Sequence, residues 1–335
     1  MEKLKIGVIG TGHMGRNHVR NLSDEKQFNL IGVYDKNADQ AKKIADEFET
    51  AAYSDPEALL KDVEAVVVAV PSSLHKETGL MVAEHGVHAL IEKPLALNST
   101  DAKEIADAFR KKDLILAVGH IERFNPVILE LKKLVNRRDI FYIEAHRYSP
   151  FTGSGRITDT SVVEDLMIHD IDLICHLMEP HRVLSINGLG ENIRSDHIDF
   201  ATCTLQFSED VHATINASRV SQEKERTISV HMLDSCITAD LLLRTLTIAK
   251  NTDVVFHGNR ADSIRQEGVV EKIFVPSEEP LRRELLSFYQ SVTERRPASV
   301  DGDAGIRAIR ICEEVVQKIR ELPGKTQTGN GGASL

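Results

Sequence analysis

The chain has 335 residues, enough for two domains with well-buried cores, and a formal net charge of −10. This acidic balance argues against nucleic acid as a partner, because binding a phosphate backbone requires a basic surface. Its four cysteines are far apart and form no C-x-x-C pair, a pattern typical of a reducing cytoplasm. A strand is expected from residue 4, which leaves no room for a signal peptide, and no apolar run approaches the roughly 20 residues of a membrane helix.

The first 35 residues are the most informative segment. Leu4–Ile9 is a short apolar run typical of a buried strand, and it leads directly into Gly10-Thr11-Gly12-His13-Met14-Gly15. A helical stretch follows, and then a second apolar run, Leu30–Tyr34, which ends on Asp35. This is the G-x-G-x-x-G fingerprint in the context that dinucleotide binding requires, with a strand before it, a helix after it and an acidic residue further on.

Each part of this fingerprint has a physical role. Gly10 permits a tight turn, Gly12 lets the backbone approach a pyrophosphate, and Gly15 lets the helix pack closely on its strand. Asp35 is placed to accept hydrogen bonds from both ribose hydroxyls of NAD and to repel the 2′-phosphate of NADP. We therefore predict NAD as the cofactor, with NADP less favoured. The cofactor-binding residues predicted from this segment are Gly10, Gly12, His13, Met14, Gly15 and Asp35.

Short apolar runs continue to alternate with helical segments as far as residue 122. Strands are expected at 65–70, 88–91 and 115–118, and helices at 41–48, 77–85 and 100–111. Ser99 or Thr100 is expected to be the N-cap of the last helix. Apolar strands alternating with helices indicate a parallel sheet covered on both faces. We therefore predict an N-terminal Rossmann domain over residues 1–122.

A different pattern follows, in which β-rich runs are joined by short polar turns. These runs lie at 140–147, 183–189, 198–207, 211–219, 227–233, 236–242, 245–249 and 271–275, with helices expected at 161–178, 281–295 and 304–321. Short connections favour antiparallel pairing. We predict an α/β protein whose second domain, residues 123–322, is an α+β domain on a large open, mainly antiparallel sheet. Residues 323–335, rich in Gly, Ser and Thr, are expected to form a flexible tail.

Glu92-Lys93-Pro94 directly follows the strand expected at 88–91. Ligands of open α/β sheets bind outside the carboxyl ends of the strands, so Lys93 is expected near the nicotinamide end of the cofactor. A lysine at this position can donate a hydrogen bond to a substrate hydroxyl and stabilise the developing alkoxide. The alternative is an ordinary solvated lysine.

The segment 163–178 carries acids and histidines at helical spacing. If it forms one continuous helix, Asp165, His169, Asp172 and His176 share a face beside an apolar stripe. His169 can take the proton released when an alcohol is oxidised, and Asp165 can orient its imidazole or hold the substrate. The alternative is a solvated helix face, which is preferred for His176 and open for Asp172. No ligand spacing elsewhere completes a metal site, and none is predicted.

Residues 118–126 join the two predicted domains. Arg123 and Asn125 are expected either to hold the domains together or to contact the substrate, with the structural role preferred for Arg123. His120 ends a strand on the cleft side, and both roles are open for it.

In order and spacing, these motifs together with Val70–His75 and Glu92–Ala96 resemble the glucose-fructose oxidoreductase/inositol dehydrogenase (Gfo/Idh/MocA) family over nearly the whole chain. The resemblance implies NAD-dependent hydride transfer from a secondary alcohol of a sugar, and a homodimer or homotetramer formed through the C-terminal sheet. His120 stands where many members carry tyrosine. The resemblance implies Lys93, Asp165 and His169 as catalytic residues, and Pro71, His75, Glu92 and Lys93 as cofactor contacts.

Within the family, residues 119–126 and 166–172 look most like the UDP-N-acetylglucosamine 3-dehydrogenase branch. Arg147, Tyr148 and Arg156 lie on or beside a Gly/Ser-bearing loop that can offer donors to a second pyrophosphate, the alternative being a flexible loop with solvated arginines. Two other functions stay open: an inositol or free-monosaccharide dehydrogenase, and a non-catalytic NAD-binding redox regulator. The predicted substrate contacts are Lys93, His120, Arg123, Arg156, Asp165 and His169.

Overall fold

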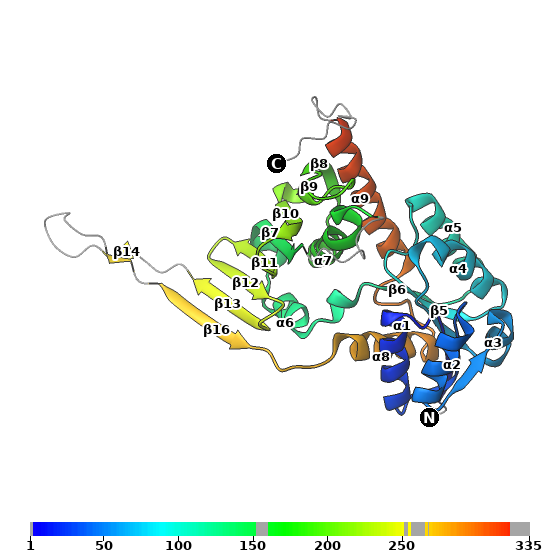
Figure 1. The fold of residues 1–335 in the computed structure, drawn as a ribbon. Coiled ribbons are helices and arrows are strands. Elements are labelled where there is room, and N and C mark those ends of the chain that lie inside the picture. Colours follow the sequence, from blue (N-terminus) through cyan, green and yellow to red (C-terminus); the bar gives the residue numbers. More distant parts are fainter. Residues whose placement is uncertain (1–2, 152–159, 251–253, 256–264, 267, 322–335) are drawn as a thin grey trace, which may run out of the picture. The chain divides into compact units, whose positions relative to one another are not determined.

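The computed structural model describes residues 3–151, 160–250, 254–255, 265–266 and 268–321 (Figure 1). It divides into two compact units, one made of Met1–Lys133 with Phe274–Arg310 and the other of Leu134–Ile273 with Ile311–Leu335. The predicted tail at 323–335 and the predicted substrate contact Arg156 lie outside the described residues.

The first unit is built on a parallel sheet of six strands in the order β3-β2-β1-β4-β5-β6. This is the strand order of a Rossmann fold, in which the chain reverses its direction of travel between β1 and β4. The strands are β1 (Leu4–Ile9), β2 (Phe28–Tyr34), β3 (Ala51–Tyr53), β4 (Ala65–Val68), β5 (His88–Glu92) and β6 (Leu116–Gly119). The predicted N-terminal Rossmann fold is confirmed.

Helices connect these strands and follow the last of them. They are α1 (His13–Asp24), α2 (Ala38–Glu47), α3 (Pro56–Asp62), α4 (His75–Glu84), α5 (Ser99–Lys111) and α6 (Pro126–Leu134), with short 3₁₀ turns η1 (Ser72–Leu74) and η2 (Ile121–Phe124). The N-cap predicted for α5 is wrong. Asn98, not Ser99 or Thr100, caps this helix, because its side-chain oxygen accepts from the Asp101 N–H at 2.8 Å.

Helix α8 (Pro280–Thr293) belongs to the first unit although it lies late in the sequence. Leu285 and Phe288 are buried in the same apolar core as Val8 and Val33 of the parallel sheet. The domain boundary predicted between residues 122 and 123 stays a prediction. The division into compact units adds residues 274–310 to the unit that contains the Rossmann sheet. The physical reason is the apolar face that α8 buries there.

The second unit is built on an eight-stranded sheet in the order β16-β13-β12-β11-β7-β10-β9-β8. Its strands are β7 (Ile140–Pro150), β8 (Val183–Glu191), β9 (Phe200–Phe207), β10 (His212–Ser221), β11 (Glu225–Met232), β12 (Ser235–Asp240), β13 (Thr245–Lys250) and β16 (Val269–Phe274). Strands β7 and β10 pair in parallel, and the pairs β8–β9, β9–β10, β7–β11, β11–β12 and β12–β13 are antiparallel. The predicted α/β class with a mainly antiparallel second sheet is confirmed.

Smaller elements complete this unit. They are the 3₁₀ turns η3 (Arg137–Asp139) and η5 (Ser208–Asp210), the π-helix η4 (Val163–Met167), α7 (Ile168–Met178), α9 (Gly302–Glu321), whose C-terminal half belongs here, and a two-stranded sheet of β14 (Val254–Val255) and β15 (Arg265–Gln266).

One face of the large sheet packs against helices. A Cβ added at Gly188 would lie 2.8 Å from the Val315 carbonyl oxygen, so β8 and α9 are in close contact. On β7, Ile143 and Ala145 are buried, whereas the alternate residues Tyr142 and Glu144 are partly exposed. This alternation is the pattern of a sheet with one covered and one open face.

Candidate active site

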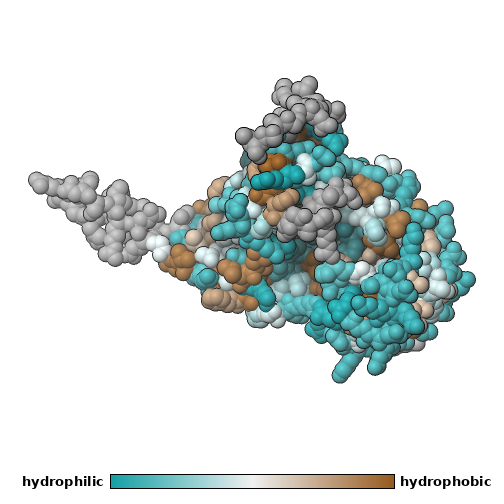
Figure 2. All heavy atoms as spheres, in the orientation of Figure 1, coloured by the Kyte–Doolittle hydropathy of each residue, from teal (hydrophilic) through white to brown (hydrophobic). Residues whose placement is uncertain are grey.

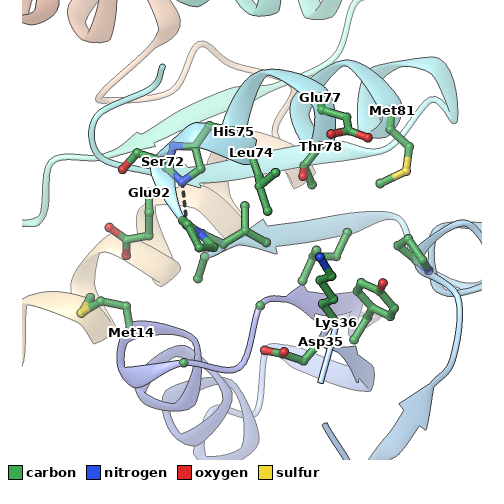
Figure 3. Close-up of a pocket in the computed structure, with 18 of the residues that line it drawn as sticks. Met14, Asp35, Lys36, Ser72, Leu74, His75, Glu77, Thr78, Met81 and Glu92 are labelled. Carbon is green, nitrogen blue, oxygen red and sulfur yellow. Dashed lines mark hydrogen bonds between the residues drawn. The ribbon is translucent and has the colours of Figure 1, made fainter. Parts of the chain in front are cut away.

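A pocket of about 830 Å³ lies at the carboxyl ends of β1, β2, β4 and β5 (Figure 3). This is where open α/β sheets bind their ligands. Most of the predicted cofactor contacts line it, namely Gly10, Gly12, Met14, Asp35, Pro71, His75, Glu92 and Lys93. His13 and Gly15 are not among its lining residues: His13 is the exposed first residue of α1, and Gly15 is buried in that helix.

The three fingerprint glycines meet different constraints. Gly10 has φ of +92°, and a Cβ there would lie 2.6 Å from the Ala69 carbonyl oxygen. A Cβ on Gly15 would lie 1.8 Å from the carbonyl oxygen of Gly10, so a side chain would push α1 away from the loop. In contrast, a Cβ on Gly12 would meet nothing within 4 Å. The backbone at Gly12 therefore faces open space, as close approach by a pyrophosphate requires.

Asp35 is anchored to the glycine loop. Its Oδ2 accepts hydrogen bonds from the backbone N–H of Thr11 at 2.7 Å and from the Thr11 hydroxyl at 3.0 Å. Its Oδ1 accepts from the backbone N–H of Asn37 at 2.9 Å. These bonds fix a carboxylate at the end of β2 against the pocket. Oδ2 already accepts two hydrogen bonds, whereas Oδ1 accepts one and keeps a lone pair for a ribose hydroxyl.

His75 connects two loops of the pocket. Its Nδ1 lies 2.7 Å from the Pro94 carbonyl oxygen, and its Nε2 lies 3.0 Å from that of Val70. Burial lowers the pKa of His75, although the two carbonyl oxygens and Glu92 oppose this shift. The neutral ring has one N–H and donates to one carbonyl at a time. Its position indicates that it holds the Pro94 turn and the Val70–Pro71 loop in place at the pocket wall.

Glu92 has a partner that sequence reasoning missed. The Oε1 atom of Glu92 lies 2.7 Å from Nε2 of His18 on α1, and His18 is fully buried. Oε2 accepts from the backbone N–H of Lys93 at 3.3 Å. Burial raises the pKa of Glu92, but His18 and Lys93 outweigh it and the net pKa is below its usual value. The available signal was a histidine on the same helix face as Gly15, Val19 and Leu22.

Lys93 lies where the sequence placed it. It follows the last residue of β5, is partly exposed and lines the pocket together with Glu92. The ammonium group is thus carried by the end of a buried strand rather than by a surface loop. Its catalytic role stays a prediction.

Asp165 and His169 belong to the second unit. The predicted continuous α-helix at 161–178 is wrong in its first part, because Val163–Met167 forms a π-helix that precedes α7. A π turn takes in more residues than an α turn and shifts the face on which later side chains lie, and such turns are frequent at functional sites. Asp165 and His169 are both partly exposed.

The predicted polar face is also divided. Asp172 is only 2% exposed, so a solvated position for this residue is wrong. His176 is mostly buried as well, with its Nδ1 3.4 Å from Glu179, which corrects the preferred solvated interpretation. Asp165 lies within the π turn, whereas His169, Asp172 and His176 lie on the α7 helix that follows it.

Arg147 has a structural partner instead of the predicted position at a diphosphate loop. Its Nε donates to Asp170 Oδ2 at 2.7 Å and its Nη2 to Oδ1 at 2.8 Å, and both side chains are at most 2% exposed. This bidentate pair joins β7 to α7. The prediction that Arg147 offers its guanidinium to a pyrophosphate is therefore wrong. Tyr148, on the other face of β7, lies with its hydroxyl 3.0 Å from Nδ1 of His146.

Arg219 on β10 is a second residue that the sequence did not reveal. It is 2% exposed, and its Nη2 donates to the carbonyl oxygen of Thr160 at 2.6 Å. Burial lowers the pKa of Arg219, and the charges of Asp165 and Asp199 oppose that shift. Since arginine stays protonated, this cation supports the segment from which Asp165 projects.

His120 and Arg123 are both buried at the end of the parallel sheet, at 1% and 4% exposure. The Nη1 atom of Arg123 donates to the Ser299 carbonyl oxygen at 3.4 Å, so it attaches η2 to the segment before α9. Asn125 caps α6, where its Oδ1 accepts from the Val127 N–H at 3.1 Å. These contacts favour the structural role for Arg123, and substrate contact by His120 or Arg123 stays a prediction.

Among the described residues, no group of three or more His, Cys, Asp and Glu side chains is arranged to hold a metal ion. Within the same ranges, no helix combines the length and apolar character needed to cross a membrane.

The parallel sheet in Rossmann order, the glycine turn with its open backbone at Gly12, and the anchored carboxylate of Asp35 define a dinucleotide-binding protein. Residues 4–120 match the model of the oxidoreductase family with an NAD-binding Rossmann fold, and residues 138–235 match the GFO/IDH/MocA C-terminal domain. The chain belongs to the Gfo/Idh/MocA family, as the sequence resemblance predicted. Its cofactor is NAD, and it is a dehydrogenase acting on CH–OH groups.

Three known proteins are similar to this chain in sequence or in fold. UDP-N-acetylglucosamine 3-dehydrogenase of Acidithiobacillus ferrooxidans is 32% identical, with 94% of this chain and 97% of that protein covered. Its solved structure matches 95% of this chain and 98% of its own with a TM-score of 0.85. Myo-inositol 2-dehydrogenase of Thermotoga maritima is 26% identical over 95% of this chain and 97% of that protein. A levoglucosan dehydrogenase complex with NADH and levoglucosan shares the fold at 19% identity over 96% and 98% of the two chains, with a TM-score of 0.81.

Proposed function

We propose that the protein is a UDP-N-acetylglucosamine 3-dehydrogenase, which oxidises the hydroxyl at position 3 of the nucleotide-linked sugar with NAD. The observation that carries this proposal is the 32% identity to the Acidithiobacillus ferrooxidans enzyme, which extends over 94% of the chain. Residues 119–126 and 166–172 support the same branch of the family by their sequence.

The residues of the pocket fit NAD. The open backbone at Gly12 admits the pyrophosphate at the start of α1, and Asp35 accepts the ribose hydroxyls. This orientation directs the nicotinamide end towards Glu92 and Lys93. When bound, NAD supplies the hydride acceptor.

The proposed chemistry divides between the two units. His169 takes the proton of the substrate hydroxyl, and the hydride leaves the carbon that carries this hydroxyl for NAD. The alcohol thereby becomes a ketone. Lys93 donates a hydrogen bond to the substrate oxygen and stabilises the developing alkoxide. Asp165, one turn from His169, orients the imidazole, and the nearby cation of Arg219 supports its carboxylate. The meeting of Lys93 with the Asp165–His169 pair is part of the proposal.

A second candidate is an inositol or free-monosaccharide dehydrogenase. The Thermotoga maritima inositol enzyme supports it, since it aligns over 95% of the chain. The pairing of Arg147 with Asp170 supports it as well, because one of the side chains expected at a diphosphate is used elsewhere. A non-catalytic redox regulator has no need for the combination of Lys93, Asp165 and His169, and it is the least favoured alternative.

A substrate panel tests the proposal directly. The purified protein is mixed with NAD and with UDP-sugars, inositols or free sugars, and the NADH absorbance is followed. We expect UDP-N-acetylglucosamine to give the highest kcat/KM and UDP alone to inhibit competitively. Turnover of an inositol or a free sugar without inhibition by UDP would favour the second candidate. Binding of NADH without turnover of any compound would revive the regulator.

We further propose that the protein forms a homodimer or homotetramer through the open face of the eight-stranded sheet, where alternate residues of β7 are partly exposed. Figure 2 shows apolar residues gathered over the β13–β16 end of this sheet, where Val269 and Val270 are exposed. Such residues are more often covered in an assembly. Light scattering during gel filtration tests the oligomeric state, and a monomer at micromolar concentration would contradict this assignment.

A cytoplasmic location is proposed from the cysteines. All four are free thiols, and Cys175, Cys203 and Cys312 are buried. Free thiols are the usual state in a reducing compartment. Fractionation of the source cells with an antibody against this chain tests the location.

A further inference from the structure

Glu284 is a buried carboxyl group that the proposed reaction does not use. It lies in the middle of α8, is 2% exposed, and neither of its carboxyl oxygens has a hydrogen-bond partner among the described residues. Burying a carboxylate without a partner is costly, so the group is expected to keep its proton.

Next to Glu284 lies a cavity of about 10 Å³, just large enough for one water molecule. Its lining includes Glu284, Ser287 and Ser291, and the Ser291 hydroxyl donates to the Ser287 carbonyl oxygen at 3.0 Å. A water molecule there can accept the proton of Glu284 in a hydrogen bond and donate to a neighbouring hydroxyl oxygen. The setting is therefore suited to a neutral acid.

Glu92, in the wall of the NAD pocket, lies close to this cavity. Val118 lines the cavity together with Glu284, the next residue Gly119 pairs with Glu92 across β5 and β6, and a Cβ on Gly119 would lie 2.9 Å from Glu92 Oε2. Burial and the charge of Glu92 raise the pKa of Glu284 well above its usual value. Glu92 itself stays ionised, because His18 and the Lys93 backbone lower its pKa more than burial raises it. The two carboxyl groups thus share one negative charge and one proton at neutral pH.

Other titratable and charged groups lie on the elements that pack against α8. The buried His120 directly precedes η2, and Glu122 of η2 accepts a hydrogen bond from Asn125 at 3.1 Å. From α1, His18 is bonded to Glu92, Arg20 pairs with Glu279, and Glu25 pairs with Arg282 near the surface. From η2, Arg123 donates to the Ser299 carbonyl oxygen. Of these neighbouring groups, Glu92 is the one whose charge raises the pKa of Glu284.

We propose that Glu284 is a positioning residue that holds one proton beside Glu92 and thereby couples the oxidation state of the bound cofactor to pH. Figure 3 shows Glu92 near Ser72 and His75 on one side of the pocket, away from Asp35 and Lys36. The proposal rests on the cofactor orientation given under Proposed function, which places the nicotinamide near Glu92, and it is independent of which sugar is oxidised.

The coupling follows from charge. The oxidised nicotinamide ring is positive and the reduced ring is neutral, so NAD stabilises a second carboxylate near Glu92 and NADH does not. Binding of NAD therefore favours release of the Glu284 proton to solvent. By linkage, rising pH strengthens NAD binding relative to NADH binding.

Calorimetry with the cofactor alone tests this coupling. Binding of NAD and of NADH is measured between about pH 6 and 9 in pairs of buffers with different ionisation enthalpies, which gives the number of protons released. For the wild type we expect release of up to one proton with NAD and none with NADH. Glu284→Gln, which keeps the shape of a neutral acid, is expected to abolish the difference. Glu294→Gln at the end of the same helix, with a side chain 58% exposed, is the matched control and is expected to behave as the wild type.

The outcomes separate this proposal from the proposed function. Equal proton release with NAD and NADH in the wild type overturns the coupling, whether or not the variant folds. A difference that persists in E284Q shows that another group is responsible. Failure of every sugar substrate leaves this measurement unaffected, because no sugar is present.

Unfolding provides a second readout. A raised pKa in the folded chain means that stability falls as pH rises towards that pKa. The ratio of the unfolding equilibrium constants of the wild type and E284Q is therefore expected to change by up to about tenfold per pH unit in this range. Parallel stability curves for the two proteins contradict a buried proton on Glu284.

Discussion

His18 of the first helix and Glu92 at the end of β5 form a buried pair, with Nε2 and Oε1 2.7 Å apart, directly before Lys93 in the chain. The pair joins the helix that begins at the glycine turn to the strand that carries the proposed catalytic lysine. This one contact thus links the helix at the expected pyrophosphate end of the pocket to the strand at its expected nicotinamide end.

The first prediction concerns this pair. His18→Leu is expected to lower the free energy of unfolding at pH 7 by about 3 kcal/mol, because a buried carboxylate loses its partner. The contribution of Glu92 is present at neutral pH and is lost as the pH falls through its lowered folded-state pKa, so the deficit of the variant should shrink in acid. Urea unfolding at several pH values measures both effects.

A double variant provides the control. H18L combined with Glu92→Gln removes the charge together with its partner, and it is expected to recover part of the lost stability. A double variant less stable than H18L would show that the ion pair is not the source of the effect.

The Rossmann unit was predictable because its information is local in sequence. The apolar strands, the glycine turn and Asp35 follow one another within 35 residues, and each has a recognisable pattern. Two short elements were not predicted, β3 with three residues and α3 with seven. Segments of this length are too short to show a clear hydrophobic periodicity.

The buried polar partners could not be predicted because they depend on tertiary contacts. His18 and Glu92 are 74 positions apart, and Arg147 and Asp170 are 23 apart. Helical periodicity places His18 and Glu284 on buried faces but does not identify what each one meets. The π turn before α7 likewise depends on packing around it, so the regular spacing of Asp165, His169 and Asp172 was misleading.

Lys93→Ala is predicted to lower kcat by ~10²-fold or more, the scale of a general acid–base contribution, while the Kd of NADH is unchanged. The reason is that Lys93 is proposed to stabilise charge on the substrate oxygen, whereas the cofactor is expected to be held mainly at the glycine turn and Asp35. Steady-state kinetics and NADH fluorescence titration provide the two measurements. Unchanged kcat would remove Lys93 from the mechanism.

Asp35→Ala is predicted to reduce the preference for NAD over NADP by about tenfold or more, since each 1.4 kcal/mol of lost discrimination corresponds to a factor of ten. Both the ribose hydrogen bonds and the repulsion of a 2′-phosphate are lost in this variant. The Kd values of NADH and NADPH measure the effect.

Asp35 also accepts hydrogen bonds from Thr11, so D35A could act by loosening the glycine loop. A control variant separates this effect from the loss of charge. Thr11→Val removes the hydroxyl that donates to Asp35 and leaves the carboxylate. It is expected to weaken both cofactors equally. If T11V changes the preference as much as D35A does, loop geometry rather than charge selects the cofactor.

Variants of the Arg147–Asp170 pair test whether the role of Arg147 is to form a buried ion pair or to bind a ligand. Asp170→Asn leaves the buried guanidinium without a countercharge and is expected to lower the free energy of unfolding by about 3–5 kcal/mol. Arg147→Met with Asp170→Leu replaces both charges by apolar groups and is expected to fold with stability close to the wild type. Because the bidentate pair occupies the guanidinium, UDP should bind this double variant and the wild type with the same Kd. A folded double variant that no longer binds UDP would show that Arg147 contacts the nucleotide. In that case the pairing of Arg147 with Asp170 would not exclude a diphosphate contact.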